Sequence, residues 1–455
     1  MRLATPRQVG SLLPTQPLVR SAALWSMPEW PRVQSFKTPK VFPSTRVLAN
    51  RKEIVAMNSF EIGRDLTAVT MGIDAFERSQ PADKSLLGGE GLVPIFLGDG
   101  MVQARSYADR DAIKADIVAL EEATAKLAAG PRKTFLEGMV KSLRVAVKML
   151  SGASPSFEEK VTDLVGAPAG REDADMIEDA RSKVDALLRK SGFVNGSLGE
   201  RVQAWEAARA VPTEQIEPVF RELMAEAKAR TDKLIFDTGD YDMALNPVRG
   251  MFYTARCVFN EGKMDLNYDL SFTRAALKHL VCHEVYPGHS TQLLSTKWAV
   301  DNGKAPVDAL LITTDAITGC VQEGIGDQGA HLIDFIEDDD DEIHVELRRV
   351  RSAAQTSAAW MLMVEGIERE TVANYLRETA MGQEAWVQGR LRMAAHPFRG
   401  PFISSYWAGN EAVRRVRERV SKEQWPDFLE ALYFHANSPA SLEMFPQTVV
   451  EKVPA

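Results

Sequence analysis

The residues with the clearest chemistry lie in the string KHLVCHEVYPGHSTQ, Lys278 to Gln292. The string holds three of the chain's seven histidines, and Glu284 directly follows His283. On a straight helix, residues four apart share a face, which is how a His-Glu-x-x-His motif brings two imidazoles to one zinc ion. Here His289 stands six residues after His283. A straight helix would leave the two side chains about 120° apart and about 9 Å displaced along its axis.

The Pro287-Gly288 pair between the histidines changes this geometry. Proline removes a backbone N–H and crowds the carbonyl four residues earlier, and the residue before it, Tyr286, is disfavoured in helical geometry. Glycine adopts dihedral angles that are closed to other residues. We therefore predict that a helix kinks or ends near Tyr286, and that His289 turns back towards His283.

A competing pair also exists. His279 and His283 are four apart, so they would share a face without any break in the helix. Glu284 would then follow the second histidine, unlike the order in zinc peptidases. Histidines that only cap a helix or bond a carbonyl are the third explanation, and the local string leaves all three open.

Two carboxylates follow about forty residues later, in the string TDAITGCVQEGIGDQGAHLIDF. Glu323 and Asp327 are four apart in this predicted helix, so they point the same way. A zinc site made of two imidazoles and one carboxylate keeps a fourth position for water. Glu323 fits the carboxylate ligand. Asp327 fits an acceptor for the other ring N–H of a ligating histidine, which would fix its tautomer.

The same predicted helix contains three glycines near the carboxylates, Gly324, Gly326 and Gly329. Each glycine inside a helix costs about 1 kcal/mol relative to alanine. Three of them so close together predict that another element packs tightly against this helix.

The elements that would position these residues are mainly helical. Segments 110–130, 173–192 and 212–235 have helical apolar periodicity with fitting end signals. Residues 250–272 have the pattern of two short strands joined by a glycine-containing turn. From Thr273 onward the apolar residues again have helical spacing. We predict a mainly α, multi-helix fold with a small β-hairpin or sheet beside the site helix. The acidic run EDDDDE is interpreted as a solvated loop or an acidic helix start.

Length and composition bound the organisation of the chain. At 455 residues it is long enough for two or three domains, and its 45% apolar and 26% charged content is that of a globular protein. We predict a helical domain at 57–235 and a metal-binding catalytic domain at 236–455. Residues 1–56, rich in Pro, Ser and Arg, are interpreted as disordered or as a mis-called leader before Met57. An organelle transit peptide is the alternative.

Charge and cysteine content exclude some partners and suggest a compartment. The net charge of −9 argues against a nucleic-acid partner, and no apolar run is long enough for a membrane span. Three cysteines without Cys-x-x-Cys spacing argue against a disulfide scaffold and favour a reducing compartment. We therefore predict a cytoplasmic protein, with organelle import through residues 1–56 as the alternative in a eukaryote. The oligomeric state is not predicted.

At these residues the chain resembles a bacterial family of unknown function. That family is marked by His-Glu-x-x-Pro-Gly-His, then Glu-Gly, then Ser-Tyr-x-x-Gly, and is grouped with the gluzincin zinc metallopeptidases. The matching strings span roughly residues 245 to 445 in the expected order; they are GMFY (250–253), HEVYPGH (283–289), EGIGD (323–327), SYWAG (405–409) and FHANSPASLEMF (434–445).

The resemblance implies a ligand set and a mechanism. It implies that His283, His289 and Glu323 bind Zn²⁺ and that Glu284 is the general base. Tyr406 would stabilise the tetrahedral oxyanion.

The resemblance also implies a substrate-binding element. GMFY, with Tyr253, would be the strand beside the cleft that pairs with an extended peptide.

Three positions depart from the family pattern, and they concern substrate contacts more than the ligand set. After Glu323-Gly324 the family has an aromatic residue and a Tyr-x-Glu, whereas this chain has Ile325, Gln328 and Ala330. The family's Pro-Gly-Gln is replaced by Gly400-Pro401-Phe402, and its second histidine after the motif by Ser290.

The combined prediction is a zinc-dependent hydrolase of a peptide or small amide substrate. Two alternatives stay open: a catalytically inactive helical scaffold with a structural metal or none, and a hydrolase of a non-peptide amide or ester. Arg390, Arg392 and Arg399 are weaker pointers to a substrate carboxylate, because surface arginines are common.

Overall fold

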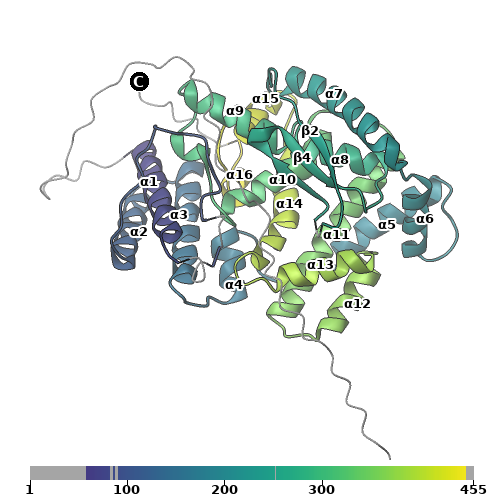
Figure 1. Ribbon diagram of the computed structural model, residues 1–455, viewed down its shortest axis with the longest axis horizontal. Helices are drawn as coiled ribbons and strands as arrows, with labels where there is room; N and C mark the ends of the chain where they lie inside the picture. The colour runs from purple at the N-terminus through teal and green to yellow at the C-terminus, as the bar shows by residue number, and fades with distance from the viewer. Residues whose placement is uncertain (1–57, 82–85, 88–90, 252, 447–455) are drawn as a thin grey trace, which may run out of the picture.

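The structure is a computed structural model that describes residues 58–81, 86–87, 91–251 and 253–446. The predicted leader at 1–56 lies outside these residues. The described chain is mainly helical with two small sheets, which confirms the predicted fold class (Figure 1). Within the described ranges, no helix combines the length and apolar character needed to cross a membrane.

The helices predicted from periodicity are present. Segments 110–130, 173–192 and 212–235 contain α2, α5 and α7, and the acidic run begins α11 with Asp338 as its N-cap. The helices of the first half are α1 (Ser59–Arg78), α2 (Arg110–Ala125), α3 (Pro131–Leu150), α4 (Phe157–Glu159), α5 (Ala174–Lys190), α6 (Leu198–Ala208) and α7 (Ile216–Leu234). Those of the second half are α8 (Arg274–Glu284), α9 (His289–Asp301), α10 (Ile317–Leu332), α11 (Asp339–Met363), α12 (Arg369–Thr379), α13 (Glu384–Ala394), α14 (Ile403–Arg419), α15 (Trp425–Tyr433) and α16 (Pro439–Glu443).

The larger sheet has three strands in the order β2-β4-β3. β3 (Ala255–Val258) and β4 (Lys263–Asn267) form the predicted antiparallel hairpin, whose turn closes at Gly262 with a positive φ of 56°. β2 (Ala244–Val248) adds a parallel partner to β4 that we did not predict. Pro247 in this strand argues against a strand when the sequence alone is considered, because proline is tolerated mainly on edge strands. β2 is such an edge strand. A second sheet pairs β1 (Ile95–Phe96) with β5 (Leu311–Ile312).

The GMFY segment is not a strand, so that prediction is wrong for its described residues, Gly250, Met251 and Tyr253. Gly250 has a positive φ of 68°, and its N–H donates to Asp269 Oδ2 at 2.6 Å. This contact turns the chain between β2 and β3. The strand begins only at Ala255.

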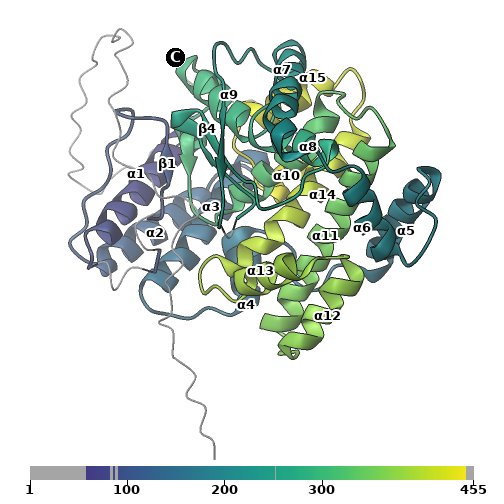
Figure 2. The ribbon, with the colours of Figure 1, turned by 45° about the vertical axis from the view of Figure 1, so that its right-hand side comes forward.

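The centre of the molecule is the contact between α10 and α14, which lie between the N-terminal helices and α11–α13 in two views (Figures 1 and 2). A Cβ at Gly324 would stand 2.1 Å from the carbonyl oxygen of Gly409, and one at Gly409 would stand 1.7 Å from that of Cys320. On the same helix, a Cβ at Gly329 would stand 2.6 Å from the carbonyl oxygen of Cys282 in α8. The predicted tight packing against the glycine-containing helix is therefore confirmed.

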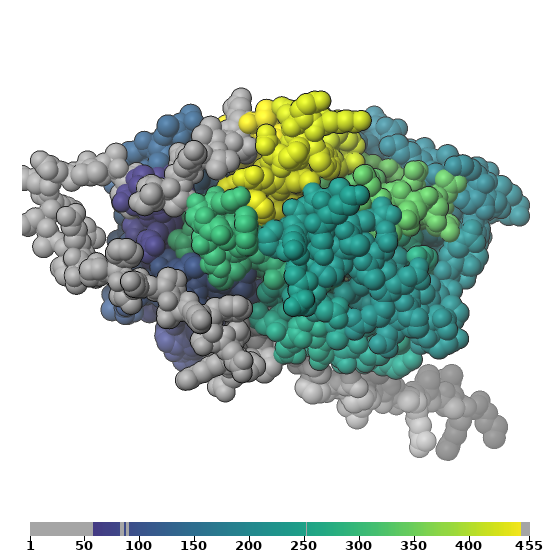
Figure 3. Space-filling model, turned by 90° about the horizontal axis from the view of Figure 1, so that it is seen from above, coloured from purple at the N-terminus to yellow at the C-terminus, as the bar shows by residue number. Residues whose placement is uncertain are grey.

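The apolar cores join segments far apart in the chain. One core contains Leu136 and Val161 from the first half together with Ile317 and Ile403 from the second. Seen from above, the teal surface around α7 also adjoins the yellow C-terminal surface (Figure 3). The predicted domain boundary at 235/236 therefore stays a prediction, across which apolar side chains pack.

The α10–α14 contact yields a first prediction. Gly409→Ala should lower the free energy of unfolding by about 1–3 kcal/mol or more, because the new methyl group meets a backbone carbonyl that cannot rotate away. Chemical denaturation followed by circular dichroism measures this. Gly389→Ala in α13 is the matched control, since its Cβ would meet nothing within 4 Å. That variant should be neutral or stabilised by up to about 1 kcal/mol. Equal stability of both variants would contradict the tight α10–α14 contact.

Candidate metal centre

The predicted break in the histidine stretch is present. α8 ends at Glu284 and α9 begins at His289, so the helix ends just before Tyr286 as predicted. A Cβ at Gly288 would stand 1.8 Å from the carbonyl oxygen of His283, so no larger residue fits at this turn. The turn lets the chain double back against the end of α8.

The turn brings His289 to His283. Their ring centroids are 4.8 Å apart and nearly perpendicular. From α10, Glu323 places its Oε2 atom 3.2 Å from His283 Nε2. One ligand atom from each of the three residues lies within 4.8 Å of the others.

The three side chains fit a zinc ion. Zinc–nitrogen and zinc–oxygen bonds of about 2.0–2.1 Å in a tetrahedron place neighbouring ligand atoms about 3.3 Å apart. The separation of 3.2 Å between His283 Nε2 and Glu323 Oε2 matches that value. Glu323 Oε2 is buried, and among the described residues its only polar neighbour within ion-pair distance is His283 Nε2, without a well-directed hydrogen bond. A buried carboxylate oxygen left this way is costly unless a cation or donor satisfies it.

The other ring nitrogen of His283 faces a second carboxylate. His283 Nδ1 lies 3.2 Å from Asp327 Oδ1, so the ring stands between Glu323 and Asp327. Burial alone would lower the pKa of His283, but the two carboxylates outweigh it and raise the pKa to about 10. Two carboxylates therefore act on this one ring. Gly326 allows the approach, because a Cβ there would stand 2.7 Å from His283 Nδ1.

Asp327 is surrounded by donors and acts as the centre of a buried network. Arg348 of α11 places Nη2 2.8 Å from Asp327 Oδ1, and Asn410 of α14 donates to Oδ2 at 3.3 Å. His279 Nε2 lies 3.6 Å from the same Oδ1 atom. Burial by itself would raise the pKa of Asp327, but Arg348 and His283 hold it well below its usual range. Asp327 is thus an ionised carboxylate that already has a cationic partner.

This network bears on the choice between the two histidine pairs. His279, His283 and Asp327 also have atoms within 4.8 Å of one another. A metal there would compete with the Arg348 guanidinium for Asp327 Oδ1. The geometry favours the cluster of His283, His289 and Glu323, with Asp327 behind His283.

Glu284 and Tyr406 both lie near this cluster. Burial, with the Glu284 carboxylate, raises the pKa of the Cys257 thiol, which places Glu284 beside β3. Burial, and next the charge of Glu323, raise the pKa of Tyr406 above its ordinary value. Tyr406 is therefore a neutral phenol able to donate a hydrogen bond.

Tyr253 lies in the loop before β3. Its hydroxyl donates to Asp265 Oδ2 at 3.5 Å, and its ring faces the Arg256 guanidinium at 5.7 Å. Its predicted role in substrate binding stays a prediction.

Sequence reasoning missed Arg348 and Asn410. Asn410 directly follows SYWAG, so its place next to a motif was an available signal. Arg348 lies in α11, where nothing in the sequence marks one arginine among several as facing the site.

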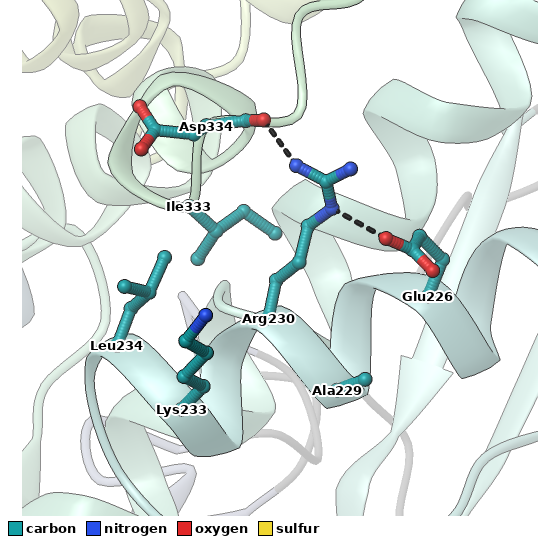
Figure 4. A pocket seen from close by; sticks show the side chains of 7 residues that line it. All are labelled: Glu226, Ala229, Arg230, Lys233, Leu234, Ile333 and Asp334. Atoms are coloured by element: carbon teal, nitrogen blue, oxygen red, sulfur yellow. Dashed lines mark hydrogen bonds and ion pairs between the residues drawn. The ribbon is translucent and has the colours of Figure 1, made fainter.

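A surface pocket elsewhere in the molecule has none of this chemistry (Figure 4). It lies between α7 and the end of α10, and its arginine, Arg230, is already paired with Glu226 at 2.7 Å. The pocket is lined by Glu226, Ala229, Arg230, Lys233, Leu234, Ile333 and Asp334.

Comparisons with known proteins bear on the fold. No protein-family model matches the chain, and no curated protein matches it. Two solved structures are similar. One is described as "the putative lipoprotein from Colwellia psychrerythraea", with 15% identity over 84% of this chain and 73% of that chain, and a TM-score of 0.50. The other is "a putative lipoprotein of unknown function from Shewanella oneidensis", with 14% identity over 86% and 88%, and a TM-score of 0.51. At such identities the likeness shows a shared fold.

These neighbours contradict the predicted cytoplasmic location, because both are described as putative lipoproteins. The prediction rested on the sparse cysteines. The three cysteines are free and buried. Cysteine content was therefore a poor guide to location, and we withdraw the prediction.

Metal analysis of single variants tests which histidine pair is used. We expect about one zinc per chain in the purified protein, measured by elemental analysis. His289→Ala should lose most of the zinc, while His279→Ala should retain it, because only His289 belongs to the cluster with Glu323. The reverse pattern would assign the metal to the regular-helix pair.

A second test concerns the carboxylate. Glu323→Gln removes the charge that faces His283 Nε2 and should lose most of the metal. Full zinc content in that variant would remove Glu323 from the site.

Proposed function

We propose that this protein is a zinc-dependent hydrolase of peptide or related amide bonds, similar to the gluzincins. One observation carries the proposal. Two imidazoles and one carboxylate from three helices meet within 4.8 Å, and the buried carboxylate oxygen faces one of these imidazoles at 3.2 Å without a well-directed hydrogen bond. Catalytic zinc sites use three such ligands and leave a fourth position for water.

The side chains around the cluster have the properties that hydrolysis requires. Zinc held by His283, His289 and Glu323 would polarise the carbonyl and lower the pKa of a water molecule. Glu284, the residue after a ligand, would take the proton from that water and pass it to the leaving amine. Tyr406, kept neutral by burial and by the nearby Glu323 charge, would donate a hydrogen bond to the oxyanion.

The packing supports a joint role for the separate motifs. Glu323 directly precedes Gly324, and Tyr406 lies one helical turn before Gly409. The backbone contact between these two glycines holds the proposed ligand and the proposed oxyanion donor on adjacent helices. This arrangement favours the resemblance to the family with the His-Glu-x-x-Pro-Gly-His signature.

The edge of the sheet suggests where an extended substrate would bind. β3 is the last strand in the order β2-β4-β3, and Cys257 in its middle lies beside Glu284. An edge strand offers backbone N–H and C=O groups to a further strand. β3, instead of GMFY, would therefore pair with the peptide.

Replacing Glu284 separates metal binding from catalysis. Glu284→Gln should fold and keep its zinc, yet lose hydrolysis by about 10²–10⁴-fold or more, because the amide cannot accept the proton. Glu261→Gln, an exposed glutamate at the hairpin turn, is the control and should keep full activity. Peptide-library hydrolysis and elemental analysis on the same samples give both readouts. Loss of zinc in Glu284→Gln would make Glu284 a ligand or a structural residue. Full activity would exclude it as the base.

Tyr406→Phe should have an intermediate effect. It removes one hydrogen bond to the oxyanion while the metal remains, so kcat should fall by about 10²–10³-fold with unchanged zinc content. An unchanged kcat would exclude Tyr406 from the mechanism.

The same measurements address the other candidates. A zinc-containing protein that hydrolyses neither peptides nor simple amides and esters would match the inactive scaffold. Activity confined to esters or non-peptide amides would match the third alternative.

A further inference from the structure

Arg390 in α13 is an arginine without a counter-ion. Its side chain is half-buried, and its guanidinium carbon lies 5.6 Å from the Trp386 ring centroid. Nη1 donates a long hydrogen bond of 3.4 Å to Gln355 Oε1. The buried Nε has no hydrogen-bond partner among the described residues. Across that same part of the chain, no carboxylate forms an ion pair with Arg390.

Other arginines in partly buried positions do have carboxylate partners. Arg348 pairs with Asp327 at 2.8 Å, Arg349 with Glu411 at 3.0 Å, and Arg230 with Glu226 at 2.7 Å. Burying a guanidinium without an anion is costly, and burial accordingly lowers the pKa of Arg390. Arginine nevertheless keeps its charge at any ordinary pH. Arg390 therefore carries a positive charge that no carboxylate of the described residues neutralises.

The surroundings of Arg390 connect it to the candidate metal centre. The groups close enough to act on its charge are Tyr406 and Arg348. The charge of Glu323 in turn acts on Tyr406. Arg348 forms an ion pair with Asp327, which also contacts His283. Arg390 therefore lies within electrostatic range of the proposed oxyanion donor, and its hydrogen bond to Gln355 joins it to α11, the helix that carries Arg348. An anionic group bound by Arg390 would belong to the substrate whose scissile bond lies at the proposed metal site.

We propose that Arg390 binds a free carboxylate of the substrate. Arginine presents a planar fork of N–H donors that matches a carboxylate, and such charge-assisted pairs are among the strongest hydrogen bonds. The inference rests on the proposed hydrolase and names its substrate class: short peptides or N-acyl amino acids that carry a carboxylate close to the cleaved bond. The carboxylate is either the C-terminal one or that of an acidic side chain.

Matched substrates test the proposal. Three versions of one short peptide are compared: a free C-terminus, a C-terminal amide, and a C-terminal amide with an added Asp or Glu near that end. The wild-type protein should prefer a carboxylate-bearing version over the plain amide by roughly 10- to 100-fold in kcat/KM. The version that is preferred identifies the source of the carboxylate.

Two variants connect the preference to Arg390. Arg390→Gln should reduce the ratio of kcat/KM between carboxylate and amide versions to near one, mainly through KM, and Arg390→Lys should retain part of it. Arg369→Gln alters an exposed arginine of α12, whose Nη2 donates to Gln388 Oε1, and should leave the ratio unchanged. An equal loss on all substrates in Arg390→Gln would mean a structural role and overturn the proposal. A wild-type protein that cleaves acid and amide versions equally would overturn it too, while leaving the hydrolase standing.

A binding measurement separates this proposal from the hydrolase itself. Isothermal titration with N-acetylglycine and N-acetylglycinamide should show binding of the acid only, weakened about tenfold or more in Arg390→Gln at equal zinc content. Binding of the acid without peptide hydrolysis would contradict the hydrolase and keep the anion site. Acid binding that is identical in wild type and Arg390→Gln would assign the carboxylate to the metal and overturn the role of Arg390.

Discussion

The contact between α10 and α14 through Gly324 and Gly409 is the constraint on which the site depends. Each glycine presses its backbone against a carbonyl of the other helix, with no room for a Cβ. The helices therefore approach more closely than side chains would allow, and the residues beside the glycines, Glu323 and Tyr406, come near each other. Further along α10, Gly326 admits the His283 ring. One helix thus sets the positions of the carboxylate, an imidazole and the phenol.

Charge balance explains why these groups stay together. Two carboxylates on one face of α10 would repel each other unless positive charge separated them. The His283 ring lies between them, and Arg348 lies on the far side of Asp327. Glu323 Oε2 is buried between His283 and the side from which His289 approaches, without a well-directed hydrogen bond among the described residues. In our proposal one cation would complete this site, and Arg390 would bind an anionic group of the substrate.

The sequence predicts local features well because their causes are local. The Pro287-Gly288 pair ends α8 for steric reasons that involve only neighbouring residues. Helical periodicity likewise locates α2, α5 and α7. The errors come from long-range causes. The resemblance implied a strand at GMFY, but a hydrogen bond from Gly250 to Asp269 turns the chain there. Arg348 belongs to the site only because α11 packs against α14, which no short motif records. Location could not be read from cysteines that are simply buried.

The most direct measurement of the central claim is anomalous X-ray scattering at the zinc edge from crystals of the purified protein. If zinc is bound as we propose, one strong peak lies about 2.0–2.1 Å from His283 Nε2 and within bonding distance of His289 and Glu323. A peak between His279 and Asp327 would contradict the proposed ligand set. The absence of any peak in protein prepared with added zinc would contradict the metal centre itself.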